Sequence, residues 1–90
     1  MDKHFTIKVA GKVQGVFFRA STKTKADDLG IKGFVRNEPD GSVYIEAEGD
    51  EGILKKFIEW CCRGPQNASV IKCDVTEDEV QKYENFRIQR

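Results

Sequence analysis

Neither sign of charge predominates in this sequence of 90 residues, because 15 basic residues are balanced by 15 acidic ones. Proteins that bind nucleic acid nonspecifically carry a basic excess, so we expect no nucleic-acid partner, whereas a small anionic ligand needs only a local positive site. No apolar run approaches the roughly 20 residues of a membrane span, and the opening residues Met1 to Phe5 do not form the apolar segment of a secretory signal. We therefore expect a cytoplasmic protein without a membrane partner.

Cysteine and histidine are also scarce. The three cysteines, Cys61, Cys62 and Cys73, form no C-x-x-C pair, and the single histidine, His4, lies far from them in the sequence. This spacing argues against a zinc site, so we expect no bound metal. We expect reduced and partly buried thiols, with a disulfide from Cys73 to one of the adjacent pair as the alternative. His4 has no evident titratable partner, so we expect a surface residue rather than a general base.

The length allows a single domain, residues 1–90, with one modest hydrophobic core. Apolar residues that alternate with polar ones predict five strands, at residues 5–9, 31–37, 43–48, 69–75 and 85–89. Apolar residues three or four apart predict two helices, one from residue 18 or 19 to 29 and one that follows a cap at Asp50 and ends at Gly64. This order matches the ferredoxin-like α+β arrangement, an antiparallel sheet with two helices on one face, plus a short extra strand.

The segment from Gly11 to Arg19 (GKVQGVFFR) joins the first predicted strand to the first predicted helix through a glycine-bearing turn. Backbone N–H groups there lack intrahelical acceptors and the helix dipole adds partial positive charge, so together with Arg19 the segment suits a phosphate-sized dianion. The alternative is a structural turn with a solvated arginine. A site is favoured because the dipole disfavours a basic residue in a first helical turn unless an anion offsets it. The apolar residues at 13 and 16–18 also make the loop stiff and partly dry, which strengthens hydrogen bonds to charge.

This loop contains no nucleophile. Residues Gln14 to Arg19 have the six-residue length of the phosphate loops of cysteine-dependent phosphatases, but no Cys, Ser or Asp begins the loop, so a covalent phosphoenzyme is not supported. Among the flanking apolar residues, Val13 and Phe18 should belong mainly to the core. Asn37 ends the second predicted strand beside the turn at residues 38–42, and taken alone it is interpreted as a turn residue.

Two longer motifs resemble the acylphosphatase family: V-Q-G-V-F-F-R at residues 13–19 and G-F-V-R-N-x-x-D-G-S-V at residues 33–43, with a weaker third around Gly64-Pro65. The resemblance extends over nearly the whole chain. It implies the same ferredoxin-like fold and hydrolysis of acyl phosphates to a carboxylate and inorganic phosphate, without metal or cofactor. It assigns catalysis to Arg19, which would hold the phosphoryl group, and to Asn37, which would orient the attacking water. It assigns substrate binding to the loop residues Gln14, Gly15, Val16, Phe17 and Phe18.

Two other functions remain as alternatives. RNA-recognition domains share this fold, and Lys32 to Val35 (KGFV) resembles part of their motif, but the segment falls on the second predicted strand rather than the third, and the spaced aromatics of a stacking platform are missing. A noncatalytic phosphate-sensing domain is the second alternative, because acylphosphatase-like domains occur inside larger proteins. The simplest expectation is a monomer whose partner is a small-molecule acyl phosphate.

Overall fold

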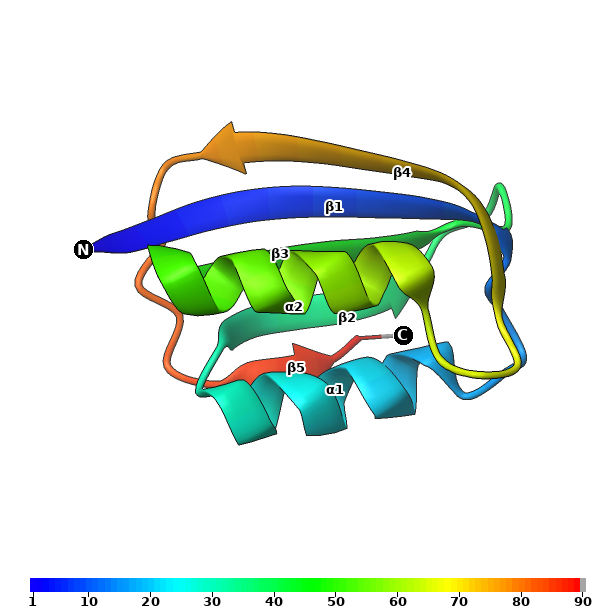
Figure 1. The fold of residues 1–90 in the computed structure, drawn as a ribbon, viewed down its shortest axis with the longest axis horizontal. Helices are drawn as coiled ribbons and strands as arrows, with labels where there is room; N and C mark the ends of the chain where they lie inside the picture. Colours follow the sequence, from blue (N-terminus) through cyan, green and yellow to red (C-terminus); the bar gives the residue numbers. More distant parts are fainter. Residues whose placement is uncertain (90) are drawn as a thin grey trace.

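The computed structural model describes residues 1–89, and within them the elements follow the predicted order (Figure 1). The bounds are β1 (Asp2–Lys12), α1 (Phe18–Leu29), β2 (Lys32–Asn37), β3 (Val43–Asp50), α2 (Glu51–Arg63), β4 (Ser69–Asp78) and β5 (Phe86–Ile88). The helices begin and end where the sequence predicts. β1 and β4 are longer than their apolar alternation, because residues outside the alternation continue the strand pairing: residues 2–4 and 10–12 in β1, and residues 76–78 in β4.

The sheet has the strand order β4-β1-β3-β2-β5. The first four strands pair antiparallel, as predicted, and the ferredoxin-like α+β fold is confirmed. The short last strand differs, because β5 forms the edge of the sheet beside β2, pairs with it in parallel and so makes the sheet mixed. None of the helices in residues 1–89 is long and apolar enough to cross a membrane.

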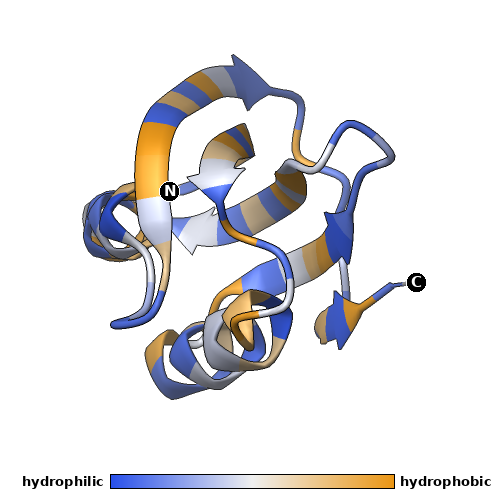
Figure 2. Cartoon of the chain, turned by 90° about the vertical axis from the view of Figure 1, so that its right-hand side faces the viewer, coloured by the Kyte–Doolittle hydropathy of each residue, from blue (hydrophilic) through white to orange (hydrophobic). Residues whose placement is uncertain are grey.

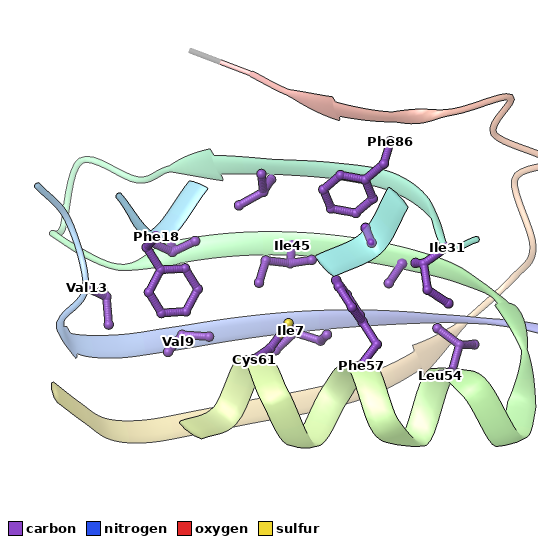
Figure 3. Close-up of a cluster of buried hydrophobic side chains, with 14 residues drawn as sticks. Ile7, Val9, Val13, Phe18, Ile31, Ile45, Leu54, Phe57, Cys61 and Phe86 are labelled. Atoms are coloured by element: carbon purple, nitrogen blue, oxygen red, sulfur yellow. The ribbon is translucent and has the colours of Figure 1, made fainter. Parts of the chain in front are cut away.

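Both helices cover the same face of the sheet and lie side by side (Figure 1). Apolar and polar residues alternate in bands along the helices and strands (Figure 2), and the apolar bands meet between helices and sheet. Leu54, Phe57 and Cys61 project from α2 into this layer, where all three are fully buried (Figure 3). Full burial of a side chain such as Leu54 or Phe57 contributes about 1.5–3 kcal/mol. The buried layer fixes the ends of the sheet relative to the helices.

A β-bulge redirects β1 toward the loop that precedes α1. The register against β4 shifts between Ala10 and Gly11, and Gly11 has a φ of 129°. A Cβ at this position would collide with the backbone carbonyl of Ser69, so only glycine fits. Beyond the bulge the fully buried side chain of Val13 anchors the start of the loop in the core, as the sequence predicts.

A disulfide joins α2 to β4. Cys62, near the end of α2, is bonded to Cys73, with a Cα–Cα distance of 5.4 Å that is usual for such a bond, while Cys61 is free and buried. The expectation of three reduced thiols is therefore wrong. Adjacent helical residues point in directions about 100° apart, so Cys61 can face the core while Cys62 faces β4.

The expectation that His4 lies at the surface is also wrong, because its side chain is only 1% exposed. Its ring lies between two carboxylates of β3, with Nδ1 2.7 Å from Glu48 and Nε2 3.0 Å from Glu46. Residues 79–85, here called the crossing segment, run from β4 at one edge of the sheet to β5 at the other and cover this site. Backbone N–H groups of Gln81 and Tyr83 donate to the Glu48 carboxylate.

Candidate active site

A cavity of about 740 Å³ opens where the loop after β1, the first turn of α1 and the ends of β2 and β5 meet. The described residues that line it are Val13, Gly15, Phe17, Phe18, Arg19, Ala20, Asn37 and Ile88. Five of these eight were predicted as site residues from the sequence: Gly15, Phe17, Phe18, Arg19 and Asn37. The two motifs, separated by a whole helix in the chain, thus contribute to one cavity because β1 and β2 flank β3 and their motif-bearing ends lie at the same end of the sheet.

The loop backbone has the conformation and the free donors of an anion site. Gly15 and Phe17 both have left-handed backbone angles, with φ values of 74° and 60°. Left-handed residues within a tight turn bring successive backbone N–H groups into an anion-binding concavity. Within residues 1–89, none of the N–H groups of residues 15–19 donates a hydrogen bond, and no side chain caps α1. All of these residues except Val16 line the cavity, and their N–H groups are available to a ligand.

Phe17 is unusual in two respects at once. A bulky residue in the left-handed region is disfavoured by about 1–2 kcal/mol, and its side chain is 80% exposed. Its neighbour Phe18 is 2% exposed and packs in the core against Trp60, with ring centroids 6.2 Å apart. The buried ring of Phe18 therefore holds the loop in place, while the ring of Phe17 is left over the cavity.

Arg19 supplies the only formal charge among the described residues that line the cavity. It lies in the first turn of α1, where the helix dipole already adds partial positive charge and no acidic residue offsets it. One guanidinium nitrogen, Nη1, lies 3.4 Å from the backbone carbonyl of Gln89, just beyond β5. No carboxylate within residues 1–89 forms an ion pair with it. The fork of guanidinium donors thus remains suited to an oxyanion.

Asn37 lies at the end of β2, half-buried at the cavity wall. Its side-chain amide makes no hydrogen bond within the described residues, in contrast to Asp40 in the following turn. Asp40 accepts from the hydroxyl and N–H of Ser42, and these bonds hold the pKa of Asp40 well below its usual range. The turn predicted at residues 38–42 is therefore stabilised by Asp40, and the amide of Asn37 is left available to a ligand.

Gln14 and Val16 do not line the cavity. The Gln14 side chain donates from Nε2 to the backbone carbonyls of Glu38 and Ser42, at 2.9 Å each. This bridge ties the loop after β1 to the turn after β2 and so fixes Asn37 relative to the loop. Val16 packs against the core. The structure therefore gives both residues a supporting position around the site.

Ile88 was not predicted as a site residue. It reaches the cavity because β5 runs parallel to β2, with Val35 opposite Ile88, and ends beside the first turn of α1. The sequence shows only a short alternation around Phe86 and Ile88, which gives no indication of pairing partner or direction. The contact is a property of the chain topology.

Comparison with known proteins assigns the chain to a family. The acylphosphatase family model matches residues 5–88. The chain belongs to the acylphosphatase family. It is 49% identical to an acylphosphatase of Ligilactobacillus salivarius over 96% of this chain and 97% of that one, and 46% identical to one of Thermotoga maritima over 96% of both. The chain is therefore an enzyme that hydrolyses acyl phosphates, as the resemblance implied.

Solved structures agree with this assignment. A crystal structure of acylphosphatase from Bacillus subtilis superposes with a TM-score of 0.94 at 36% identity, with both chains covered in full. An acylphosphatase from Coxiella burnetii gives 0.93 at 36% identity, over 98% of this chain and 93% of that one. The whole of this chain also superposes on a part of full-length HypF that makes up 12% of that chain, with a TM-score of 0.89 and 30% identity. Related domains thus occur both alone and within a larger protein.

Proposed function

We propose that the phosphoryl group of an acyl phosphate binds between Arg19 and the free N–H groups of residues 15–19, and that Asn37 orients the water that attacks phosphorus. The observation that carries the proposal is the convergence of three kinds of polar group on one cavity: within residues 1–89, these are backbone donors without acceptors, a guanidinium without a carboxylate partner and an amide without a hydrogen bond. Arg19 and the N–H groups neutralise the charge on the phosphoryl oxygens through the transition state. The Asn37 amide both accepts and donates, so it can hold a water molecule but is too weak a base to deprotonate it.

The reaction balances without a protein acid or base. Water oxygen bonds to phosphorus as the bond between phosphorus and the bridging oxygen breaks, and the electron pair of that bond leaves with the carboxylate. The acyl phosphate dianion and water become a carboxylate and dihydrogen phosphate, because both protons of the water end on phosphate oxygens. A carboxylate is a weakly basic leaving group that needs no protonation, so positioning and charge stabilisation suffice.

Arg19 gives the direct test of this proposal. Arg19→Lys keeps the charge but loses the two-pronged guanidinium, so we expect hydrolysis of benzoyl phosphate to fall by at least about 10²-fold and inhibition by inorganic phosphate to weaken. The matched control is Arg63→Lys at the exposed end of α2, which should leave both measurements unchanged. If Arg19→Lys kept full activity, the guanidinium would have no part in holding the phosphoryl group.

We also propose that turnover needs no metal ion. The cavity lining contains no carboxylate, histidine or cysteine among the described residues, so these side chains offer no usual ligand set for a divalent cation. Hydrolysis of benzoyl phosphate should proceed at the same rate after dialysis against EDTA as after addition of magnesium. A loss of activity on chelation that magnesium restores would show that the ion takes part.

RNA binding is less well supported by the structure. Phe34, Tyr44 and Tyr83 do meet on the face of the sheet away from the helices, with Phe34 ring centroids 5.9 and 6.0 Å from the other two. Phe34 is only 8% exposed, however, and the guanidinium of Arg36 lies 4.7 Å from the Tyr44 ring centroid. The rings pack on one another rather than offering free faces for bases. Titration with single-stranded RNA at moderate salt should show no tight, salt-sensitive binding.

A further inference from the structure

Two apolar side chains at the cavity have no other evident partner. Phe17 is 80% exposed and Ile88 is 41% exposed, and they reach the same cavity from the loop before α1 and from β5. The backbone of Phe17 is held in a left-handed conformation that a phenylalanine rarely adopts. A loop needed only for its N–H groups would be better served by glycine at this position, so the aromatic side chain itself calls for an explanation.

The cavity is larger than a phosphoryl group requires. Its volume of about 740 Å³ lies within the range of about 300–1,000 Å³ typical of sites for drug-sized ligands. The polar groups assigned to the phosphoryl group are the loop N–H groups, Arg19 and Asn37. The remainder of the described lining consists of Val13, Ala20, Ile88 and the rings of Phe17 and Phe18. Space for the rest of the substrate is therefore bordered by carbon.

Charge in the cavity points to the same class of substrate. Arg19 is the only charged residue among the described lining residues, and the proposed phosphoryl site already uses it. An acyl group with its own carboxylate or phosphate would find no second cation there and would lose hydration without compensation. An uncharged apolar acyl group would instead cover the exposed carbon of Phe17 and Ile88.

We propose that Phe17 and Ile88 form an acyl subsite, and that the enzyme favours acyl phosphates whose acyl group is uncharged and apolar, aromatic ones included. This assignment rests on the proposed function, because it takes the phosphoryl group to lie against Arg19 and the loop. The two side chains determine specificity and take no part in bond breaking. Bonds to the acyl carbon are unchanged in the reaction, so the subsite acts through binding and orientation of the substrate.

The test compares benzoyl phosphate with acetyl phosphate, which share the reacting group and differ in the apolar acyl part. For each protein, the ratio of the two kcat/KM values is measured. Each variant's ratio is then divided by the wild-type ratio, which removes the difference in intrinsic reactivity between the two substrates. Ile88→Ala should lower the benzoyl-to-acetyl ratio by at least about fivefold, since single methylene groups in apolar pockets change specificity by about tenfold or more. Phe17→Gly, which keeps the left-handed backbone accessible, should lower it further.

The matched control is Ile71→Ala, which makes the same substitution at an 81% exposed isoleucine of β4 that is not part of the cavity lining. It should leave the ratio at the wild-type value. Competitive inhibition by inorganic phosphate reports the phosphoryl site separately. If the wild type hydrolysed neither substrate, the proposed function itself would fall. If it hydrolysed both and the ratio stayed constant in Ile88→Ala and Phe17→Gly, only the subsite would be overturned.

A second comparison tests the charge argument on the wild-type enzyme alone. Butyryl phosphate and succinyl phosphate have acyl chains of the same number of carbons, but the succinyl chain ends in a carboxylate. We expect kcat/KM for butyryl phosphate to exceed that for succinyl phosphate by at least about fivefold at low ionic strength. Equal values, or a preference for the succinyl compound, would show that a cation outside the lining residues reads the acyl group and would overturn the assignment.

Discussion

At the scale of single residues, the side-chain amide of Asn37 differs from the polar side chains of the following turn, because it has no hydrogen-bond partner among the described residues. It lies at the cavity wall and makes no hydrogen bond within residues 1–89, while Asp40 and Ser42 bond one another. We predict that Asn37→Ala lowers kcat for benzoyl phosphate by about 10²-fold or more and leaves inhibition by inorganic phosphate nearly unchanged, because an oriented water is needed only for attack.

The control for this variant is Asn67→Ala, which removes an exposed amide from the turn before β4. Its kcat and its inhibition by phosphate should match the wild type. An Asn37→Ala enzyme with full kcat would show that Asn37 does not orient the attacking water. A parallel loss of phosphate affinity would instead place Asn37 on the phosphoryl group.

Phe17 gives a second prediction at this scale, one of stability. Its left-handed backbone disfavours any residue with a Cβ, whereas glycine adopts φ near 60° freely. Phe17→Gly should therefore raise the free energy of unfolding by about 0.5 kcal/mol or more, after allowance for the greater freedom of glycine in the unfolded chain. Urea denaturation would measure it. A destabilised variant would show that the ring, despite its exposure, contributes to packing.

At the scale of elements, the disulfide between α2 and β4 closes a loop around the turn that follows α2. Cys62 and Cys73 are separated by 11 residues, and a disulfide across such a short loop contributes about 2–3 kcal/mol by restricting the unfolded chain. Replacing both cysteines with serine should lower the free energy of unfolding by about that amount. For the wild-type protein, reductant should lower the free energy of unfolding by the same amount.

Alkylation distinguishes the three thiols directly. Burial raises the pKa of the Cys61 thiol, and the thiolate is the reactive form, so Cys61 should resist iodoacetamide in the folded protein. Peptide mapping should find no adduct on unreduced folded protein, two adducts after reduction and a third only in urea. An adduct on Cys62 or Cys73 before reduction would show that the bond is absent from the purified protein.

The same elements show which features of the structure can be predicted from the sequence. Periodicity predicts the helices and the four main strands because each buries one face, and the two motifs predict Arg19 and Asn37 as parts of one site. Pairing between distant segments leaves no such pattern. The direction of β5 brings Ile88 to the cavity, the packing of α2 on β4 joins Cys62 to Cys73, and the crossing segment buries His4. These three features depend on where the chain returns in space.

At the scale of the whole molecule, Glu48 anchors the crossing segment that connects the two edges of the sheet. Burial alone would raise the pKa of Glu48, but hydrogen bonds from His4 and from the N–H groups of Gln81 and Tyr83 outweigh it and hold the pKa below its usual value. The phenol of Tyr83 donates to Glu46, and burial together with this bond raises the pKa of Tyr83 to about 12, so the phenol stays protonated near neutral pH. The carboxylate of Glu48 is thus stabilised by donors from β1 and from the crossing segment.

This arrangement predicts the direction of a pH effect. Because the folded state binds a proton at Glu48 less readily than the unfolded state, Glu48 contributes stability above the ordinary glutamate pKa of about 4.3, and that contribution is lost as the pH falls through the lower folded value. Glu48→Gln should remove it, lowering the free energy of unfolding by about 2–4 kcal/mol at pH 7 and flattening its decline between about pH 5 and 3.

Urea denaturation of wild type and variant across this pH range measures both effects. The matched control is Glu59→Gln on the exposed face of α2, for which the acid slope of the wild type should persist. Since β5 follows the crossing segment and carries Ile88 to the cavity, Glu48→Gln should also lower the benzoyl-to-acetyl ratio of kcat/KM before it abolishes hydrolysis. A variant with wild-type stability at pH 7 and an unchanged acid slope would show that the buried carboxylate does not anchor the segment.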